Sequence, residues 1–346
     1  MTVDYIIVGL GLAGIAFAEE LISHNKSFVV FEDNSQNSSL VAGGMYNPVV
    51  LKRFTPVWNA KEQLDLAIPF YKKLENRFNQ TYNYKVDIYR TFKSVEEQNN
   101  WFAACDKILL QDYMIPKIIK NENKFIRAPY NSGKLIHTGR IDVNKLATDY
   151  KLFLKNENIL REEKFEYDKI DFQTDCIIYK EVKAKRVVFC EGFGLKENPF
   201  FNNLPMREAK GELITIHAPD LKVDYLIKSA IFVLPIGNDL YKVGATFNWT
   251  DKTKTPTEEG REELKFKLSS VINCNYKIVD HIAGIRPTIK DRRPLVGIHS
   301  EYKQLAILNG LGTRGVMIGP LMAKKLFQNI EYGEQLEKEI SINRFD

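Results

Sequence analysis

The sequence is poor in the residues that bind metals or form disulfides. Its four cysteines lie far apart and include no C-x-x-C pair, so neither a zinc knuckle nor a disulfide framework is predicted. The five histidines show no H-x-x-x-H or H-E-x-x-H spacing, which a zinc site on a helix requires. We therefore expect no metal, and we expect the cysteines to be reduced structural thiols.

A strong excess of one charge and a long apolar run are also missing. The formal net charge is only +5 over 346 residues, which gives no electrostatic support for nucleic-acid binding. The longest apolar segment, from Tyr5 to Ala18, is shorter than the roughly 20 residues that cross a bilayer. Asp4 precedes it where an export signal would carry a basic residue. We expect a cytoplasmic protein with no membrane association.

A glycine-rich turn near the start joins an expected strand to an expected helix. The apolar run Tyr5–Val8 is typical of a buried parallel strand, and Leu12–Ser23 is typical of a helix. Between them the sequence GLGLAG places glycines at 9, 11 and 14, which fits G-x-G-x-x-G. Gly9 permits a tight turn, Gly11 lets a pyrophosphate approach the backbone, and Gly14 lets the helix lie close to the strand. The free amides at the helix start favour phosphate binding.

An acidic residue at the expected distance completes this nucleotide-binding pattern. A second apolar strand, Ser27–Phe31, ends directly before Glu32, which lies 18 residues after Gly14. A carboxylate there can accept hydrogen bonds from both ribose hydroxyls of an adenosine and would repel the 2′-phosphate of NADP. The residues alone therefore predict a dinucleotide site and leave FAD and NAD open.

Two further glycine groups occur later in the chain. Gly43 and Gly44 leave room for a flat or bulky group to pass close to the backbone. A second G-x-G-x-x-G runs from Gly310 to Gly315, but no acid follows at the required distance and Pro320 falls near the helix start. It is not a second nucleotide fold. A helix start behind a glycine loop can instead stabilise negative charge on a reduced flavin.

The order of elements predicts an α/β fold with an inserted domain. Strand-like runs at 212–216, 231–234 and 240–246 alternate less with helices, which favours an antiparallel sheet. We expect a discontinuous Rossmann-like, FAD-binding domain and a substrate-binding domain. The first comprises residues 1–81, 136–204 and 273–346, and the second comprises residues 82–135 and 205–272.

Taken together, the ordered segments resemble the D-amino-acid-oxidase superfamily of FAD enzymes, and within it the glycine-oxidase-like members. The resemblance runs nearly end to end and is carried by VGLGLAG, AGGMYNPV, VVFCEG, FVLPIGNDLYKVGAT, AGIRPTIKDRRPLVG and GLGTRGVMIGPL. The last two segments are also similar to the oxidase module of the bifunctional enzyme that modifies the tRNA wobble uridine. The resemblance implies FAD rather than NAD.

The resemblance also implies roles for matching positions. Arg286, in GIRP, would bind the substrate carboxylate through both guanidinium nitrogens and is the one expected catalytic residue. Three residues would line the substrate pocket: Met45, Phe232 and Phe247. The expected cofactor-binding residues join both glycine turns to positions between them: Gly9, Gly11, Leu12, Ala13, Gly14, Glu32, Gly43, Gly44, Met45, Phe165, Gly192, Gly312, Thr313, Arg314, Gly315 and Val316.

The implied reaction is oxidation of the C–N bond of an amino acid or an N-substituted glycine, with hydride transfer to flavin N5. The last cysteine, Cys274, lies well before the second glycine turn, so non-covalent FAD is expected. Two alternatives stay open. A stand-alone tRNA wobble-uridine oxidase is suggested by GLGTRG and by Lys52-Arg53, with tRNA as partner, although no methyltransferase module is expected in this chain. The other is an FAD-binding protein without turnover.

Overall fold

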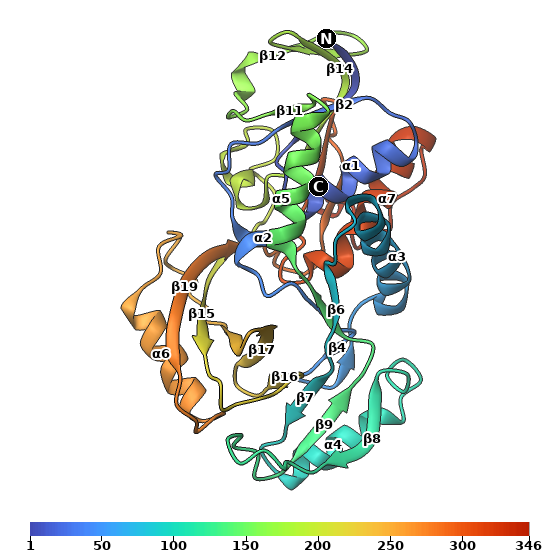
Figure 1. Ribbon diagram of the computed structural model, residues 1–346. Helices are drawn as coiled ribbons and strands as arrows, with labels where there is room; N and C mark the ends of the chain where they lie inside the picture. Colours follow the sequence, from blue (N-terminus) through green and yellow to red (C-terminus); the bar gives the residue numbers. More distant parts are fainter. Residues whose placement is uncertain (346) are drawn as a thin grey trace.

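Two eight-stranded sheets form the framework of the computed structural model, which describes residues 1–345. The first sheet lies in the upper half of Figure 1, with the N-terminus, and the second lies in the lower half. A three-stranded sheet stands between them, in the order β3 (Met45–Tyr46), β10 (Gly139–Ile141) and β6 (Asn83–Lys85). Within residues 1–345, no helix combines the length and apolar composition needed to cross a bilayer.

The first sheet has a parallel centre with antiparallel additions. Its main order is β11-β2-β1-β14-β13-β12, and β21 pairs with both β14 and β20. The pairs β11–β2, β2–β1, β1–β14 and β14–β21 are parallel. The strands are β1 (Thr2–Val8), β2 (Phe28–Phe31), β11 (Leu160–Arg161), β12 (Ile170–Phe172), β13 (Ile177–Tyr179), β14 (Val182–Phe189), β20 (Leu295–Ile298) and β21 (Leu305–Asn309).

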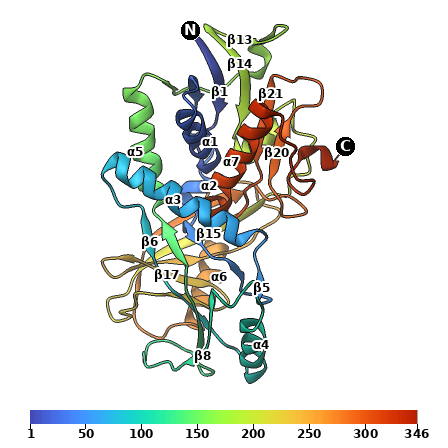
Figure 2. The same ribbon diagram turned by 90° about the vertical axis from the view of Figure 1, so that its right-hand side faces the viewer.

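Both faces of this sheet are covered, as its nearly continuous apolar strands predict. In β1, Tyr5 and Ile7 face one core cluster, whereas Ile6 and Val8 face another. Four helices pack in the first cluster and lie together in Figures 1 and 2: α1 (Leu12–Ser23), α3 (Ala60–Phe78), α5 (Val143–Asn156) and α7 (Gly315–Tyr332). Aromatic side chains of the β12–β13 region and its flanks fill the second cluster.

The second sheet is antiparallel except where β7 meets β16. Its order is β19-β15-β18-β17-β16-β7-β9-β8. Helix α6 (Glu258–Ser269) covers one face, and α4 (Val95–Cys105) packs near β8. The strands are β7 (Ile88–Thr91), β8 (Met114–Ile119), β9 (Ser132–Leu135), β15 (Ala209–His217), β16 (Leu226–Lys228), β17 (Phe232–Gly237), β18 (Leu240–Gly244) and β19 (Lys277–Arg286).

The α/β fold class is confirmed, and the division into two domains stays a prediction. Residues 277–286, which we assigned to the FAD-binding domain, form β19, and β19 pairs with β15 of the second sheet over most of its length. Long-range pairing decided this, and no local pattern reports it. The polar segment after Glu32 contains the short helix α2 (Ser38–Val41).

Helix α7 contains a proline near its start, and a tyrosine compensates for it. Pro320 has no N–H, so the carbonyl of Val316 one turn earlier loses its usual helical donor. The hydroxyl of buried Tyr71, on α3, donates a hydrogen bond of 2.8 Å to that carbonyl. This contact lets α7 continue through Pro320 without a buried, unpaired carbonyl.

We predict that Tyr71→Phe lowers the free energy of unfolding by about 1–3 kcal/mol, because it leaves the Val316 carbonyl unpaired. In a Pro320→Ala background the same substitution should cost clearly less, since residue 320 then supplies an N–H. Chemical denaturation of the four proteins in this double-mutant cycle measures both costs. Equal costs in the two backgrounds would contradict the role given to Tyr71.

Candidate active site

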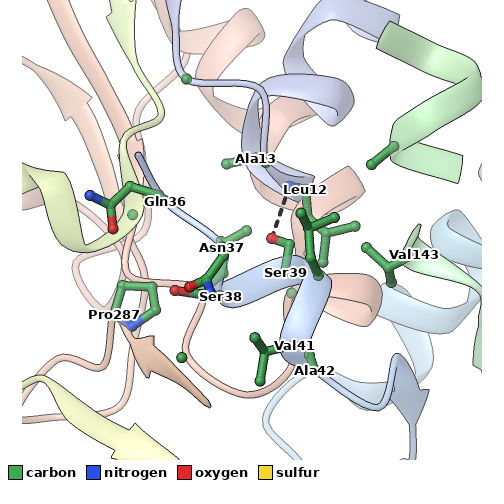
Figure 3. A pocket seen from close by; sticks show the side chains of 18 of the residues that line it. Leu12, Ala13, Gln36, Asn37, Ser38, Ser39, Val41, Ala42, Val143 and Pro287 are labelled. Carbon is green, nitrogen blue, oxygen red and sulfur yellow. Dashed lines mark hydrogen bonds between the residues drawn. The ribbon is translucent and has the colours of Figure 1, made fainter. Parts of the chain in front are cut away.

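A single cavity of about 670 Å³ lies between the two large sheets and is lined by residues of both. It contacts the glycine turn before α1, the segment around α2, the end of β19 and the glycine turn before α7. Figure 3 shows part of it, with Leu12 and Ala13 at the start of α1, Ser38 and Ser39 on α2, and Pro287 after β19. Gly11 and Gly312, 301 positions apart in the sequence, therefore line one space.

Close backbone approach explains the glycines of the first turn. Gly9 has a φ of +94°, and a Cβ there would stand 2.7 Å from the carbonyl oxygen of Cys190 on the neighbouring strand end. A Cβ on Gly14 would stand 2.1 Å from the carbonyl oxygen of Gly9. Gly11 caps α1 without a side-chain hydrogen bond. The first amide of the helix, that of Leu12, donates only a long bond of 3.4 Å, to Ser39 Oγ (Figure 3).

Glu32 links this turn to the end of β2. Its Oε2 accepts a hydrogen bond of 2.5 Å from the Leu10 amide, and its Oε1 accepts one of 2.6 Å from the Asn34 amide. Burial raises the pKa of the carboxyl group, and the two backbone bonds oppose the rise. The carboxylate thus holds the glycine turn and also lines the cavity.

Helix α7 begins beside α1 and faces the same space. Gly312 has a φ of +58°, and a Cβ on Gly315 would lie 3.0 Å from the side chain of Leu12. A Cβ on Gly319, one turn later, would lie 3.7 Å from the carbonyl oxygen of Leu12. Neither helix carries an acidic residue in its first turn, so the positive ends of both helix dipoles remain available to an anion.

The second pair of glycines lies between these helix ends and the second sheet. Gly44 has a φ of +67°, and a Cβ there would stand 2.0 Å from the carbonyl oxygen of Ile141. A Cβ on Gly43 would lie 3.6 Å from the side chains of Met45, Phe232 and Leu234. Small residues here widen the cavity next to its apolar wall.

Arg286, the last residue of β19, is a half-buried cation without an anionic partner among residues 1–345. Its Nη1 and Nη2 donate to the carbonyls of Lys210 at 3.3 Å and Thr246 at 3.2 Å. The guanidinium carbon lies 4.1 Å from the ring centre of Phe247. It crosses Gly211, where a Cβ would stand 1.9 Å from Nη2. Burial lowers the pKa of the group to about 10, and an anionic ligand would relieve the cost of burying this charge.

The structure brings nearly all of the predicted site residues to this cavity. They line it in two regions, the glycine turns and the wall made by the second sheet: Gly9, Gly11, Leu12, Ala13, Glu32, Gly43, Gly44, Met45, Phe165, Gly192, Phe232, Phe247, Arg286, Gly312, Thr313, Gly315 and Val316. Their individual roles toward a ligand stay predictions.

Two expected cofactor residues are not in the cavity wall. Gly14 faces the strand side, where it allows helix–strand contact. Arg314 caps α7, but its side chain lies in the field of Arg292 and Arg293, which together with burial lower its pKa. The Arg314 side chain is thus not part of the cavity wall, and its position beside the flavin stays a prediction. Local sequence indicated the glycine turn and could not indicate the direction of this side chain.

Sequence reasoning missed several polar residues of the cavity wall. Gln36 Oε1 and Asn37 Oδ1 are buried and lack a hydrogen-bond partner among residues 1–345. Lys228 and Glu191 also line the cavity. The only available signal was the position of Glu191 next to Gly192, directly after a strand; Lys228 stands in a short strand with no motif.

Glu191 is the most perturbed acid of the cavity. It accepts hydrogen bonds from the Tyr167 hydroxyl at 2.5 Å and from Asn198 Nδ2 at 2.8 Å. Burial is the main effect and raises the pKa of Glu191 to about 7. The adjacent Cys190 thiol also lines the cavity, and burial raises its pKa.

The chain belongs to the family described as FAD dependent oxidoreductase, whose sequence profile matches residues 4–328. The fold and the glycine-lined cavity agree with this class, so the predictions of FAD and of an oxidoreductase are confirmed. The absence of a metal stays a prediction.

Among curated relatives, the glycine oxidase of Bacillus subtilis is 23% identical over 344 residues, which cover 92% of this chain and 90% of that protein. The tRNA 5-methylaminomethyl-2-thiouridine biosynthesis bifunctional protein MnmC of Marinobacter nauticus is 20% identical and matches 94% of this chain. The chain spans only about half of that protein, 55% of its length. The glycine oxidase structure from Geobacillus kaustophilus superposes with a TM-score of 0.80 at 18% identity and 96% coverage of each chain.

The residues present fit FAD on structural grounds. The N-termini of α1 and α7 have no acidic residue in their first turns. Their positive helix-dipole ends can therefore stabilise a pyrophosphate and the electron-rich edge of the flavin ring. Buried acceptors without partners at Gln36 and Asn37 suit a ligand that donates hydrogen bonds. The cavity volume lies in the range of natural small-molecule sites.

We predict that Gly11→Ala retains the fold and lowers the FAD content of the purified protein at least tenfold. The added methyl group enters the cavity at the point where a phosphate must approach the backbone. Gly319→Ala is the matched control, because its methyl group would find only ordinary contacts of 3.6 Å or more outside the cavity wall. The ratio of flavin absorbance to protein after gel filtration is the measurement. A full FAD content in Gly11→Ala would contradict the placement.

The raised pKa of Glu191 predicts that the free energy of unfolding depends on pH. Its pKa is about 7 in the folded protein and close to the ordinary 4.5 when unfolded, so the folded state binds more protons between these values. Its contribution is therefore present below pH 4.5 and is lost as pH rises to about 7, a change of about 3 kcal/mol. Denaturation of the wild type and of Glu191→Gln from pH 5 to pH 8 should show a shallower loss in the variant. Parallel curves for the two proteins would refute this.

Proposed function

We propose that the protein oxidises the C–N bond of an amino acid or an N-substituted glycine. The observation that carries this proposal is Arg286, a half-buried guanidinium at the cavity wall whose hydrogen bonds among residues 1–345 all go to carbonyls. A carboxylate is the planar anion that a guanidinium binds through two parallel hydrogen bonds. The glycine oxidase relatives are named for an amino acid, which supports a small carboxylate-bearing amine.

FAD, when bound, would supply the hydride acceptor at N5 of its ring. The chain's own residues would position the substrate and exclude water. Arg286 would fix the carboxylate, and Met45, Phe232 and Phe247 would form apolar walls around the carbon that loses hydride. No general base is required of the protein, because the amine is oxidised in its neutral form.

We infer that FAD is held without a covalent bond. The cysteine at the cavity, Cys190, is buried, and the raised pKa of its thiol leaves it protonated and a poor nucleophile. We further propose that the two domains follow the two sheets, with β19 in the substrate domain, and that the enzyme works in the cytoplasm.

One observation favours the alternative of a tRNA-modifying oxidase. Phe247 and Trp249, near the cavity, are 59% and 51% exposed, and Arg207 stacks on the indole at 5.4 Å. Exposed aromatic rings with an arginine can hold an unstacked base. Binding of tRNA that persists at 0.2 M salt, on the order of physiological ionic strength, together with no flavin reduction by small amines, would replace the small-substrate proposal.

We predict that anaerobic addition of glycine, sarcosine, proline or a D-amino acid bleaches the flavin of the wild type. Arg286→Met should lower kcat/KM for the reactive substrate at least a hundredfold, since the carboxylate loses its only charged partner. Arg207→Met is the control, because Arg207 also stacks on an aromatic ring but does not line the cavity. Stopped-flow absorbance measures all three proteins. Unchanged flavin reduction in the Arg286→Met variant would contradict the assignment of Arg286 to the substrate carboxylate. If no amine reduces the flavin of the wild type, a non-catalytic flavoprotein is favoured.

A further inference from the structure

A second cation, Lys228, lines the same cavity and has no function in the reaction described above. It is the last residue of β16, half-buried, and its Nζ makes neither a hydrogen bond nor an ion pair with any of residues 1–345. A lysine on a cavity wall without a partner differs from a solvated surface lysine, because burial removes part of its hydration.

The charges around Lys228 are also positive. Burial and then Arg90, Lys267 and Lys93 lower the pKa of its ammonium group to about 8. The nearby carboxylate of Glu97 is already occupied, since it pairs with Arg90 at 2.5 Å and accepts a bond from the Lys93 amide at 2.7 Å. The ammonium group is therefore still charged at neutral pH, and the protein itself supplies nothing to neutralise it.

The sheet register places Lys228 on the same wall as Arg286. Lys228 pairs with Phe232, Phe232 with Gly244, and Gly244 with Leu213. Directly paired residues point to one face of a sheet, and Phe232 and Leu213 both line the cavity.

Two residues before Leu213 on the same strand, Gly211 lies beneath the guanidinium of Arg286. Strands β16 and β15 are separated by two others, so their backbones lie about 14 Å apart. The guanidinium of Arg286 reaches over β15, and Lys228 lines the same cavity from β16, so the wall between the two cations is formed by β17 and β18.

We propose that the substrate carries two acidic groups: a glycine carboxylate that binds Arg286, and a second carboxylate on the nitrogen substituent that binds Lys228. The proposal rests on the proposed function and narrows its substrate class to N-substituted glycines with an acidic substituent, such as iminodiacetate. A monoanionic amine would leave the half-buried ammonium group of Lys228 unpaired. A dianion neutralises both cations of the wall, and the walls between them are apolar.

Ligand binding to the holoenzyme tests this independently of turnover. Glutarate and butyrate, a dicarboxylate and a monocarboxylate of similar size, are titrated while the flavin absorbance is followed. The variants are Lys228→Met, Lys228→Arg and the control Lys93→Met, since Lys93 lies near Lys228 but does not line the cavity.

Glutarate should bind the wild type and Lys93→Met at least tenfold more tightly than butyrate does. This preference should fall to about onefold in Lys228→Met and largely return in Lys228→Arg. In anaerobic reduction, kcat/KM for iminodiacetate should fall at least tenfold in Lys228→Met, while that for sarcosine should change less than threefold.

No preference for glutarate in the wild type, or an unchanged preference in Lys228→Met, would overturn the proposal. If Lys228→Met does not fold, the wild-type preference and the Lys228→Arg titration decide. Reduction by sarcosine without a glutarate preference would reject the dianionic substrate alone. No reduction by any amine would reject the proposed function, and the titrations would still decide whether Lys228 binds a second carboxylate.

Discussion

Two helices that begin 303 positions apart, at Leu12 and Gly315, must start at one cavity, and the rest of the site depends on this constraint. The approach requires residues without side chains at the contact. A Cβ on Gly14 would collide with the carbonyl of Gly9, and one on Gly315 would crowd Leu12. Because the two helix starts share a space, their dipoles act on the same bound molecule rather than on two separate sites.

The charged side chains that line the cavity differ in sign between its two ends. Its nucleotide end contains the acidic groups Glu32 and Glu191, and its far wall contains the cations Arg286 and Lys228. Acids at one end suit the hydroxyl donors of an adenosine, whereas buried cations at the other suit a carboxylate. We therefore propose that the adenosine of FAD lies toward Glu32, that its ring lies beside Arg286, and that the substrate carboxylate binds at the cation end.

The sequence predicted the local elements well and their long-range pairing less well. The helix expected at Leu12–Ser23 has the predicted bounds, because hydrophobic periodicity and flanking glycines define it locally. The pairing of residues 277–286 with β15 of the second sheet could not be predicted, since sheet membership depends on pairing with a distant strand. The contact between Gly211 and the guanidinium of Arg286 also depends on this long-range pairing, so the sequence could not indicate it. Lys228 belongs to no sequence motif and could not be recognised either.

A crystal structure of the holoprotein with FAD is the most direct test of this arrangement. We expect the pyrophosphate within about 3 Å of the first amides of α1, and the ring between the start of α7 and the wall that contains Phe232 and Arg286. FAD bound outside this cavity, or inside it with the adenine at Arg286 and the ring at Glu32, would contradict the account.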